Sequence, residues 1–175
     1  MAKTPFTKLK CQVNKDIIPV QIGDETIAVK QYLPLQEKLA LMERVIEQAH
    51  NENYDYANPV LMEAITDLEI IYAYTDISFT DKQKEDILKT YDALRSSGVL
   101  TIIFDNIPNE ETSEITTGIY ITSKAIYEYR NSVKGILEHI KNNYDEFNFD
   151  TTEIIEKLGD AQNFEFVKDL LTKIG

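Results

Sequence analysis

The stretch SEITTGIYITSKAIYEYRNSVKGILEHIKNN, residues 113–143, organises the chain. Its apolar residues recur at alternating steps of four and three, the heptad spacing that lines up side chains along one side of a helix. With Thr122 filling one gap, this apolar ridge consists of Ile115, Ile119, Ile126, Tyr129, Val133, Ile136, Ile140 and Tyr144. The pattern predicts a long helix whose ridge is buried against protein. Two interpretations stay open: a central core helix and a seam between subunits.

Two positions are consistent with the start of this helix. Asn109, Glu110 and Glu111 place negative charge where it stabilises the dipole of a helix beginning there. Gly118 follows two threonines and weakens a helix by about 1 kcal/mol relative to alanine, which favours a start near Ile119.

The totals of the sequence limit the classes of protein to which the chain can belong. Its 175 residues, 43% of them hydrophobic, suffice for one domain with a substantial core. A formal charge of −12 opposes binding to a phosphate backbone, so we expect no direct nucleic-acid partner. The one cysteine, Cys11, excludes an internal disulfide and any cysteine metal cluster. No apolar run approaches the ~20 residues of a membrane span, and no signal-peptide pattern follows the N-terminal lysines, so we expect a cytosolic protein without a membrane partner.

The first 15 residues differ in charge from the rest of the chain. They contain Lys3, Lys8, Lys10 and Lys15 and no acidic residue, so all of the negative charge falls after them. One interpretation is an edge strand that lysines protect from pairing with other chains. The other is a basic arm that docks on an acidic neighbour, which could be a second copy of the chain.

Alternating apolar residues predict three strands, over residues 6–13, 18–22 and 26–32, joined by turns at residues 14–16 and 23–25. Because Pro19 lacks an N–H, the second strand is expected to be an edge strand or to be bulged there. We therefore expect a three-stranded antiparallel β-meander over residues 1–33, with its apolar face covered by helices.

Helical patterns follow from residue 34. The first helix is expected to bury Leu35, Leu39, Met42, Val45 or Ile46, and Ala49. Asn58-Pro59 predicts a capped second helix, and Thr80 with Gln83 predicts a capping box on a third helix that ends at Gly98. Residues 99–107 fit a short buried helix or strand equally well, and two short helices are expected after residue 150. The predicted fold is α+β, mainly α: a β-meander (1–33) packed on a helical bundle with one long central helix (34–175), in one cooperative domain.

No arrangement of residues points to a reaction. His50 and His139 have no companion ligand at i+3 or i+4, and the six glycines form no phosphate loop. Acidic pairs such as Asp81 and Glu85 fit solvated faces better than a glycosidase-like pair. We therefore expect no catalytic residue, no cofactor and no metal. The candidate interface consists of Lys3, Lys8, Lys10, Ile126, Tyr129 and Val133.

Three runs carry a resemblance to known proteins: residues 29–39 (VKQYLPLQEKL), 68–75 (LEIIYAYT) and 126–133 (IYEYRNSV). They resemble small proteins from tailed phages of low-GC Gram-positive bacteria, and the layout is similar to that of tail-assembly chaperones. This resemblance implies a non-enzymatic protein that escorts tape-measure or tail-tube subunits in the host cytoplasm. It assigns no site residue.

Other functions also fit the sequence. The chain could be a structural component of the phage head, neck or tail, located in the virion and contacting neighbouring virion subunits or copies of itself. It could instead be an acidic DNA mimic that inhibits a host defence protein, although lysines interrupt the acidic residues. An enzyme with a carboxylate site that the sequence does not reveal is a further alternative.

Overall fold

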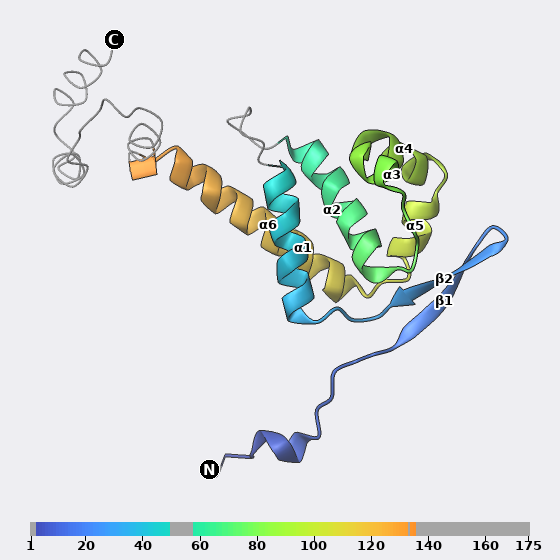
Figure 1. Cartoon of the computed structure of the whole chain (residues 1–175). Helices are drawn as coiled ribbons and strands as arrows, with labels where there is room; N and C mark the ends of the chain where they lie inside the picture. Colours follow the sequence, from blue (N-terminus) through green and yellow to red (C-terminus); the bar gives the residue numbers. More distant parts are fainter. Residues whose placement is uncertain (1–2, 50–57, 133, 136–175) are drawn as a thin grey trace, which may run out of the picture. The chain divides into compact units, whose positions relative to one another are not determined.

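The computed structural model describes residues 3–49, 58–132 and 134–135 of the chain (Figure 1). The described part is a mainly helical α+β structure with a two-stranded antiparallel sheet. In chain order its elements are η1 (Phe6–Leu9), β1 (Ile17–Ile22), β2 (Glu25–Lys30), α1 (Leu35–Ala49), α2 (Pro59–Tyr74), α3 (Asp81–Glu85), α4 (Ile87–Ser96), α5 (Val99–Phe104) and α6 (Asn109–Arg130). The chain divides into two compact units, residues 1–121 and residues 122–175, so the hairpin and α1–α5 lie in the first unit.

β1 and β2 form a hairpin around a two-residue turn that begins at Gly23. Gly23 has φ +60°, the conformation that a primed hairpin turn requires and that glycine adopts without steric penalty. Just beyond the strands, the Gln31 N–H donates to the Asp16 carbonyl at 3.0 Å. Hydrogen-bonded pairs alternate along an antiparallel ladder, so Pro19, opposite Ala28, falls at a non-hydrogen-bonded pair. Its missing N–H therefore costs the hairpin no ladder bond.

The prediction of a strand over residues 6–13 is wrong, so the expected three-stranded meander is a two-stranded hairpin. The segment contains the short 3-10 helix η1 and is exposed throughout. The edges of the hairpin explain the difference. On the outer edge of β2, the Ala28 N–H already donates to Asp76 Oδ1 at 2.9 Å. On the outer edge of β1, Pro19 offers no N–H to an added strand.

α2 occupies the centre of the first unit. Its residues 64–71 are all buried, because α1 packs on one side of the helix and α4 on the other (Figure 1). The Asn58 side chain accepts hydrogen bonds from the N–H groups of Val60 and Leu61, which confirms the predicted cap. The central helix of this unit is therefore α2 rather than the stretch 113–143.

The predicted inward face of α1 is wrong in its first half. Leu35 and Leu39 are 57% and 54% exposed, whereas Lys38 and Leu41 are buried. The reason is that the Lys38 ammonium forms ion pairs with two glutamates of α6, an interaction that no hydrophobic pattern contains. In the second half of α1 the expected residues Val45 and Ala49 are buried.

The predicted third helix is two helices, α3 and α4. The capping box of Thr80 and Gln83 is confirmed at the start of α3. The chain then leaves helical geometry at Asp86, whose φ is −92° and ψ is 68°, and the Asp86 carboxylate accepts from the Lys89 N–H to begin α4. Gly98, with φ +78°, lies two residues after the last residue of α4 and marks the end of this helical segment as expected. The ambiguous apolar run that follows is helical and forms α5.

α6 begins at Asn109, so the earlier of the two expected starts is correct. Ile115 and Ile119 of the apolar ridge are buried in the core of the first unit. Gly118 lies within the helix, where a Cβ atom would be 2.5 Å from Sδ of Met42. The glycine therefore leaves room for the end of the Met42 side chain of α1.

The predicted continuous helix over residues 113–143 is interrupted, because α6 ends at Arg130. Two polar side chains bind the carbonyls of its last turn: Asn131 donates to the Tyr127 carbonyl at 2.8 Å and Ser132 to the Tyr129 carbonyl at 2.6 Å. Such side-chain bonds to nearby carbonyls compete with the backbone hydrogen bonds that would continue the helix. Residues 136–143 and the helices expected after residue 150 lie outside the described residues.

Candidate functional site

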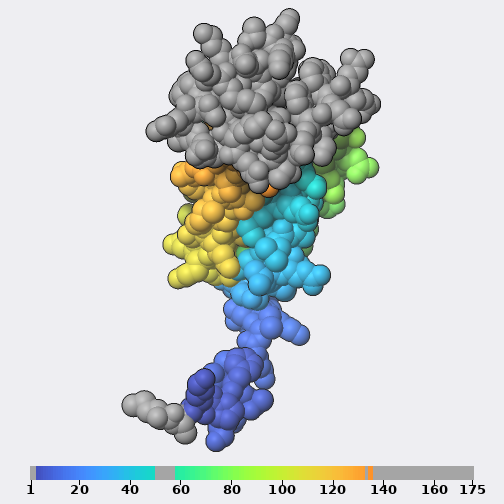
Figure 2. All heavy atoms as spheres, turned by 90° about the vertical axis from the view of Figure 1, so that its left-hand side faces the viewer, coloured from blue at the N-terminus to red at the C-terminus, as the bar shows by residue number. Residues whose placement is uncertain are grey.

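The N-terminal part of the candidate interface is exposed. Lys3, Lys8 and Lys10 lie in a segment, residues 3–16, that we call the N-terminal arm, and every residue of the arm is open to solvent. The arm also exposes large apolar side chains, namely Phe6 (71% exposed), Leu9 (59%) and Val13 (61%). Figure 2 shows the arm, in dark blue, with its side chains uncovered on the face in view. Apolar and cationic groups are therefore presented together outside the core.

The ridge part of the candidate interface lies in the second unit. Ile126 is partly exposed and Tyr129 is 45% exposed, so at these positions the ridge is not a buried core. Val133 lies outside the described residues. Beside the ridge, Lys124 and Glu128 form an ion pair at 3.8 Å across one helical turn.

Two general features of the described residues bear on metals and membranes. Within residues 3–49, 58–132 and 134–135, no group of three His, Cys, Asp or Glu side chains could hold a metal ion. Among the helices of the same residues, none has both the length and the hydropathy of a membrane span.

A buried polar network connects four segments of the first unit. Glu111, at the start of α6, accepts hydrogen bonds from the Leu33 N–H at 2.9 Å, the Tyr74 hydroxyl at 2.8 Å and the Lys38 ammonium at 2.8 Å. Lys38 is also paired with Glu114. The network thus joins α6 to α1, to the end of α2 and to the segment that follows β2.

In this network Lys38 is protonated and Glu111 is ionised, as in a structural ion pair. Burial opposes the charge on Lys38, but hydrogen bonds and charge from Glu111 and Glu114 outweigh it and hold the Lys38 pKa above its ordinary value. Burial likewise disfavours ionised Glu111, but its bonds from Lys38, Leu33 and Tyr74 outweigh that effect and lower its pKa. The amine is therefore a charged, paired ammonium rather than a free nucleophile.

A second polar cluster lies where α4 packs on α2. Burial, followed by the negative charge of Glu63, raises the pKa of Asp67 to about 6, and a hydrogen bond from Tyr91 and the charge of Arg95 only partly offset this. Asp67 is 9% exposed. The fold therefore favours the protonated, neutral form of the Asp67 side chain.

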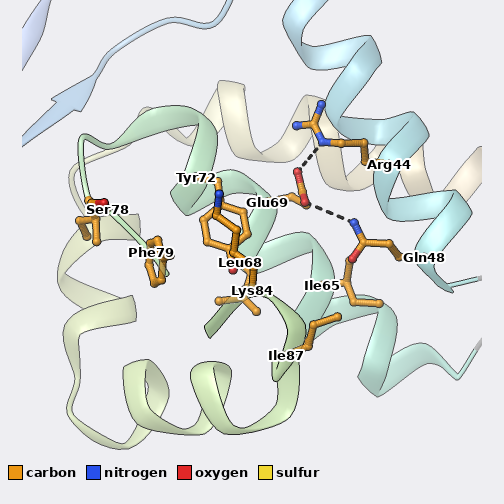
Figure 3. A pocket seen from close by; sticks show the side chains of 11 residues that line it. Arg44, Gln48, Ile65, Leu68, Glu69, Tyr72, Ser78, Phe79, Lys84 and Ile87 are labelled. Atoms are coloured by element: carbon orange, nitrogen blue, oxygen red, sulfur yellow. Dashed lines mark hydrogen bonds and ion pairs between the residues drawn. The ribbon is translucent and has the colours of Figure 1, made fainter. Parts of the chain in front are cut away.

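A cleft of 510 Å³ follows α2 between α1 and the α3–α4 region (Figure 3). This volume falls within the roughly 300–1,000 Å³ that is typical of small-ligand sites. Its apolar walls come from α2, from the segment after α2 and from the start of α4. They include Ile65, Leu68, Tyr72, Phe79 and Ile87.

The polar groups of the cleft converge from two sides. On the α1 side, Arg44 Nε lies 2.8 Å from Glu69 Oε2, and Gln48 Nε2 lies 3.4 Å from Glu69 Oε1 (Figure 3). On the α3 side, the Lys84 ammonium has no salt bridge within the part of the chain that the structure describes. The cleft thus has two cationic side chains and one carboxylate that is already paired.

The aromatic wall is fixed by an edge-to-face contact. The ring centroids of Tyr72 and Phe79 are 4.8 Å apart with the planes at 69°, a favoured aromatic geometry. Phe79 reaches this position because the chain turns back along α2 after Tyr74 and before α3 begins.

None of the cleft residues stands out as a site in the amino-acid sequence. Arg44 and Glu69 are 25 positions apart, and each reads alone as a solvated charge on an amphipathic helix. Only the packing of α1 on α2 brings them together, so no local spacing could have signalled the pair.

Comparisons with known proteins provide no relative: no protein-family model matches the chain, and no match was found among curated proteins or solved structures.

Proposed function

We propose that the chain is a non-enzymatic assembly protein of a tailed bacteriophage that acts through protein–protein contacts, as a tail-assembly chaperone. The observation that carries the proposal is the N-terminal arm, which exposes Phe6, Leu9 and Val13 beside lysines. The phage assignment is supported only by the sequence resemblance. The alternative of a virion component uses the same arm and differs in whether the protein stays in the particle.

The arm has the chemistry of a docking segment. Burial of a large apolar side chain contributes about 1.5–3 kcal/mol, so three such residues are a substantial driving force when a partner covers them. Lysines beside them attract an acidic partner and speed the encounter. Neither contribution is used by the fold of the first unit, because the arm contributes no residue to its core.

The partner follows from these properties. It presents an apolar groove with an acidic rim, as a subunit of the tape measure, the tail tube or another virion part could. A second copy of the chain is a further candidate because the body after residue 16 is acidic.

The test uses the phage that encodes the chain, with an affinity tag on the C-terminus of the protein. Mass spectrometry compares what is recovered from infected cells with the inventory of purified particles. A chaperone is recovered with tail subunits before assembly and is absent from particles, whereas a virion component is present in both.

The arm is tested by Lys8→Glu with Lys10→Glu. We expect tail subunits no longer to be recovered with this variant, because it reverses the charge at two positions of the arm without changing the core. Lys82→Glu with Lys89→Glu is the matched control, because it makes the same charge change at exposed lysines of α3 and α4. Recovery of no phage structural protein, or equal recovery by both variants, contradicts the proposal.

A further inference from the structure

We propose that the cleft beside α2 is a binding site for a carboxylate attached to an apolar or aromatic body. This inference is independent of the phage proposal, because the cleft and the arm share no residue. It depends on three features of the first unit: a cation without a salt bridge among the described residues, a second cation whose terminal nitrogens carry further donors, and an aromatic wall.

The anionic end of the ligand is recognised by Lys84 and Arg44. Lys84 lines the cleft and has no salt bridge among the described residues, so its charge is available. Arg44 uses Nε for Glu69 and carries further N–H donors on its two terminal nitrogens. A carboxylate matches this planar fork in two-point geometry.

Two donors partly offset the negative charge that Glu69 brings to the cleft. Its carboxylate accepts from both Arg44 and Gln48, and its side chain is only 9% exposed. With Glu69 paired to Arg44, the lining of the cleft keeps an excess of one positive charge, which Lys84 contributes.

The apolar end of the ligand is accommodated by Leu68, Tyr72, Phe79 and Ile87. These side chains come from α2, the segment after it and α4, so they form a wall rather than scattered surface contacts. A volume of 510 Å³ accepts one aromatic or short aliphatic group. Two sources supply this chemistry: a free amphiphile such as a medium-chain fatty acid, or an acidic and aromatic segment of a protein.

The first experiment titrates the full chain with anilinonaphthalene sulfonate, a fluorescent dye with an aromatic body and an anionic group. We expect saturable binding of one dye per chain, and about tenfold weaker binding for Lys84→Glu, because an attraction becomes a repulsion. Neutral phenylnaphthylamine, which has the same aromatic body, should bind more weakly and be insensitive to Lys84→Glu. Equal binding of the two dyes overturns the proposal.

Lys82→Glu is the matched control, because Lys82 lies on the same helix but lines a neighbouring groove rather than the cleft. Dye binding that depends on Lys82 and not on Lys84 places the dye in that groove and contradicts the proposal. Circular dichroism shows whether each variant is folded, and Lys84→Gln replaces Lys84→Glu if the latter is not. The arm variant with Lys8→Glu and Lys10→Glu should bind the dye normally, so this test and the test of the phage proposal can fail separately.

Competition distinguishes the two sources of ligand. Displacement of the dye by decanoate supports a free amphiphile, and displacement by an acetylated, amidated peptide of sequence EFLD supports a protein segment. Displacement by neither shows that the cleft does not accept carboxylates and overturns the proposal.

Discussion

The ammonium of Lys38 lies 2.8 Å from Oε1 of Glu111, where the two side chains keep 3% and 10% of their exposure. This pair joins α1 to the first turn of α6, although 73 positions separate the residues in the sequence. It also explains why a lysine rather than Leu39 faces inward on α1.

Replacement of Lys38 by methionine should destabilise the first unit strongly. The change keeps the length of the side chain but leaves the buried Glu111 carboxylate without its cation, for which we expect about 3–5 kcal/mol. Lys30→Met is the matched control, because the Lys30–Glu37 pair is 3.9 Å long and exposed; it should change stability by less than about 1 kcal/mol. Urea unfolding measures the free energy of unfolding of both variants. Equal losses would show that the buried Lys38–Glu111 pair matters no more than the exposed pair.

The Asp67 cluster makes stability depend on pH. The folded pKa is about 6 against an ordinary value of 3.8, so between these values the unfolded state ionises while the folded state keeps its proton. Stability should therefore fall as pH rises from about 4 to about 6, by up to roughly 3 kcal/mol, and stay lower above that. Glu111, whose pKa is lowered, acts in the opposite sense and loses its contribution as pH falls through its folded value.

The variant Asp67→Asn separates the contribution of Asp67 to the pH dependence of stability from that of Glu111. We expect the variant to be more stable than the parent chain at pH 7 and to lose the decline between pH 4 and 6, as thermal unfolding across that range would show. An unchanged pH profile would mean that Asp67 is not the group responsible.

Gly118 and Met42 should be energetically coupled. Alanine at position 118 gains up to about 1 kcal/mol of helix propensity but places its Cβ 2.5 Å from Sδ of Met42, near the end of a flexible side chain that can shift aside. We expect Gly118→Ala alone to gain less than this propensity difference, and to gain more of it when Met42→Ala is already present. A double-mutant cycle measures the coupling, and strict additivity would contradict the proximity of position 118 to the Met42 side chain.

The corrected face of α1 can be tested by two identical substitutions two residues apart. Leu41→Ala should cost about 2–5 kcal/mol because Leu41 has no exposed surface. Leu39→Ala, on the exposed side, should change stability by no more than about 0.5 kcal/mol. Chemical denaturation of both variants measures these losses. A larger loss for Leu39→Ala than for Leu41→Ala would support the inward face that the hydrophobic pattern predicted.

Local signals in the sequence predicted the ends of several elements. Asn58 before Pro59, Thr80 with Gln83, and Gly98 each act within three or four residues, through a side-chain bond to a nearby N–H or through a positive φ. Such features need no tertiary partner, so they can be recognised from spacing alone.

Patterns that depend on a distant partner were misjudged. Residues 6–13 alternate like a strand, yet the adjacent edge carries Pro19, and this described segment does not join the sheet. Leu35 and Leu39 have helical spacing, yet they are exposed. Helical spacing shows that apolar residues share one face of a helix, but it does not show whether that face packs on the core.

By itself the sequence determined the class of the fold, the hairpin turn, the caps and the uneven charge, since each follows from neighbouring residues or from composition. Tertiary structure alone decided that α2 is the central helix, that Lys38 is buried against Glu111, and that Arg44, Glu69 and Lys84 border one cleft. The physical reason is that burial and ion pairing are set by residues tens of positions apart, and their proximity exists only after the helices have packed.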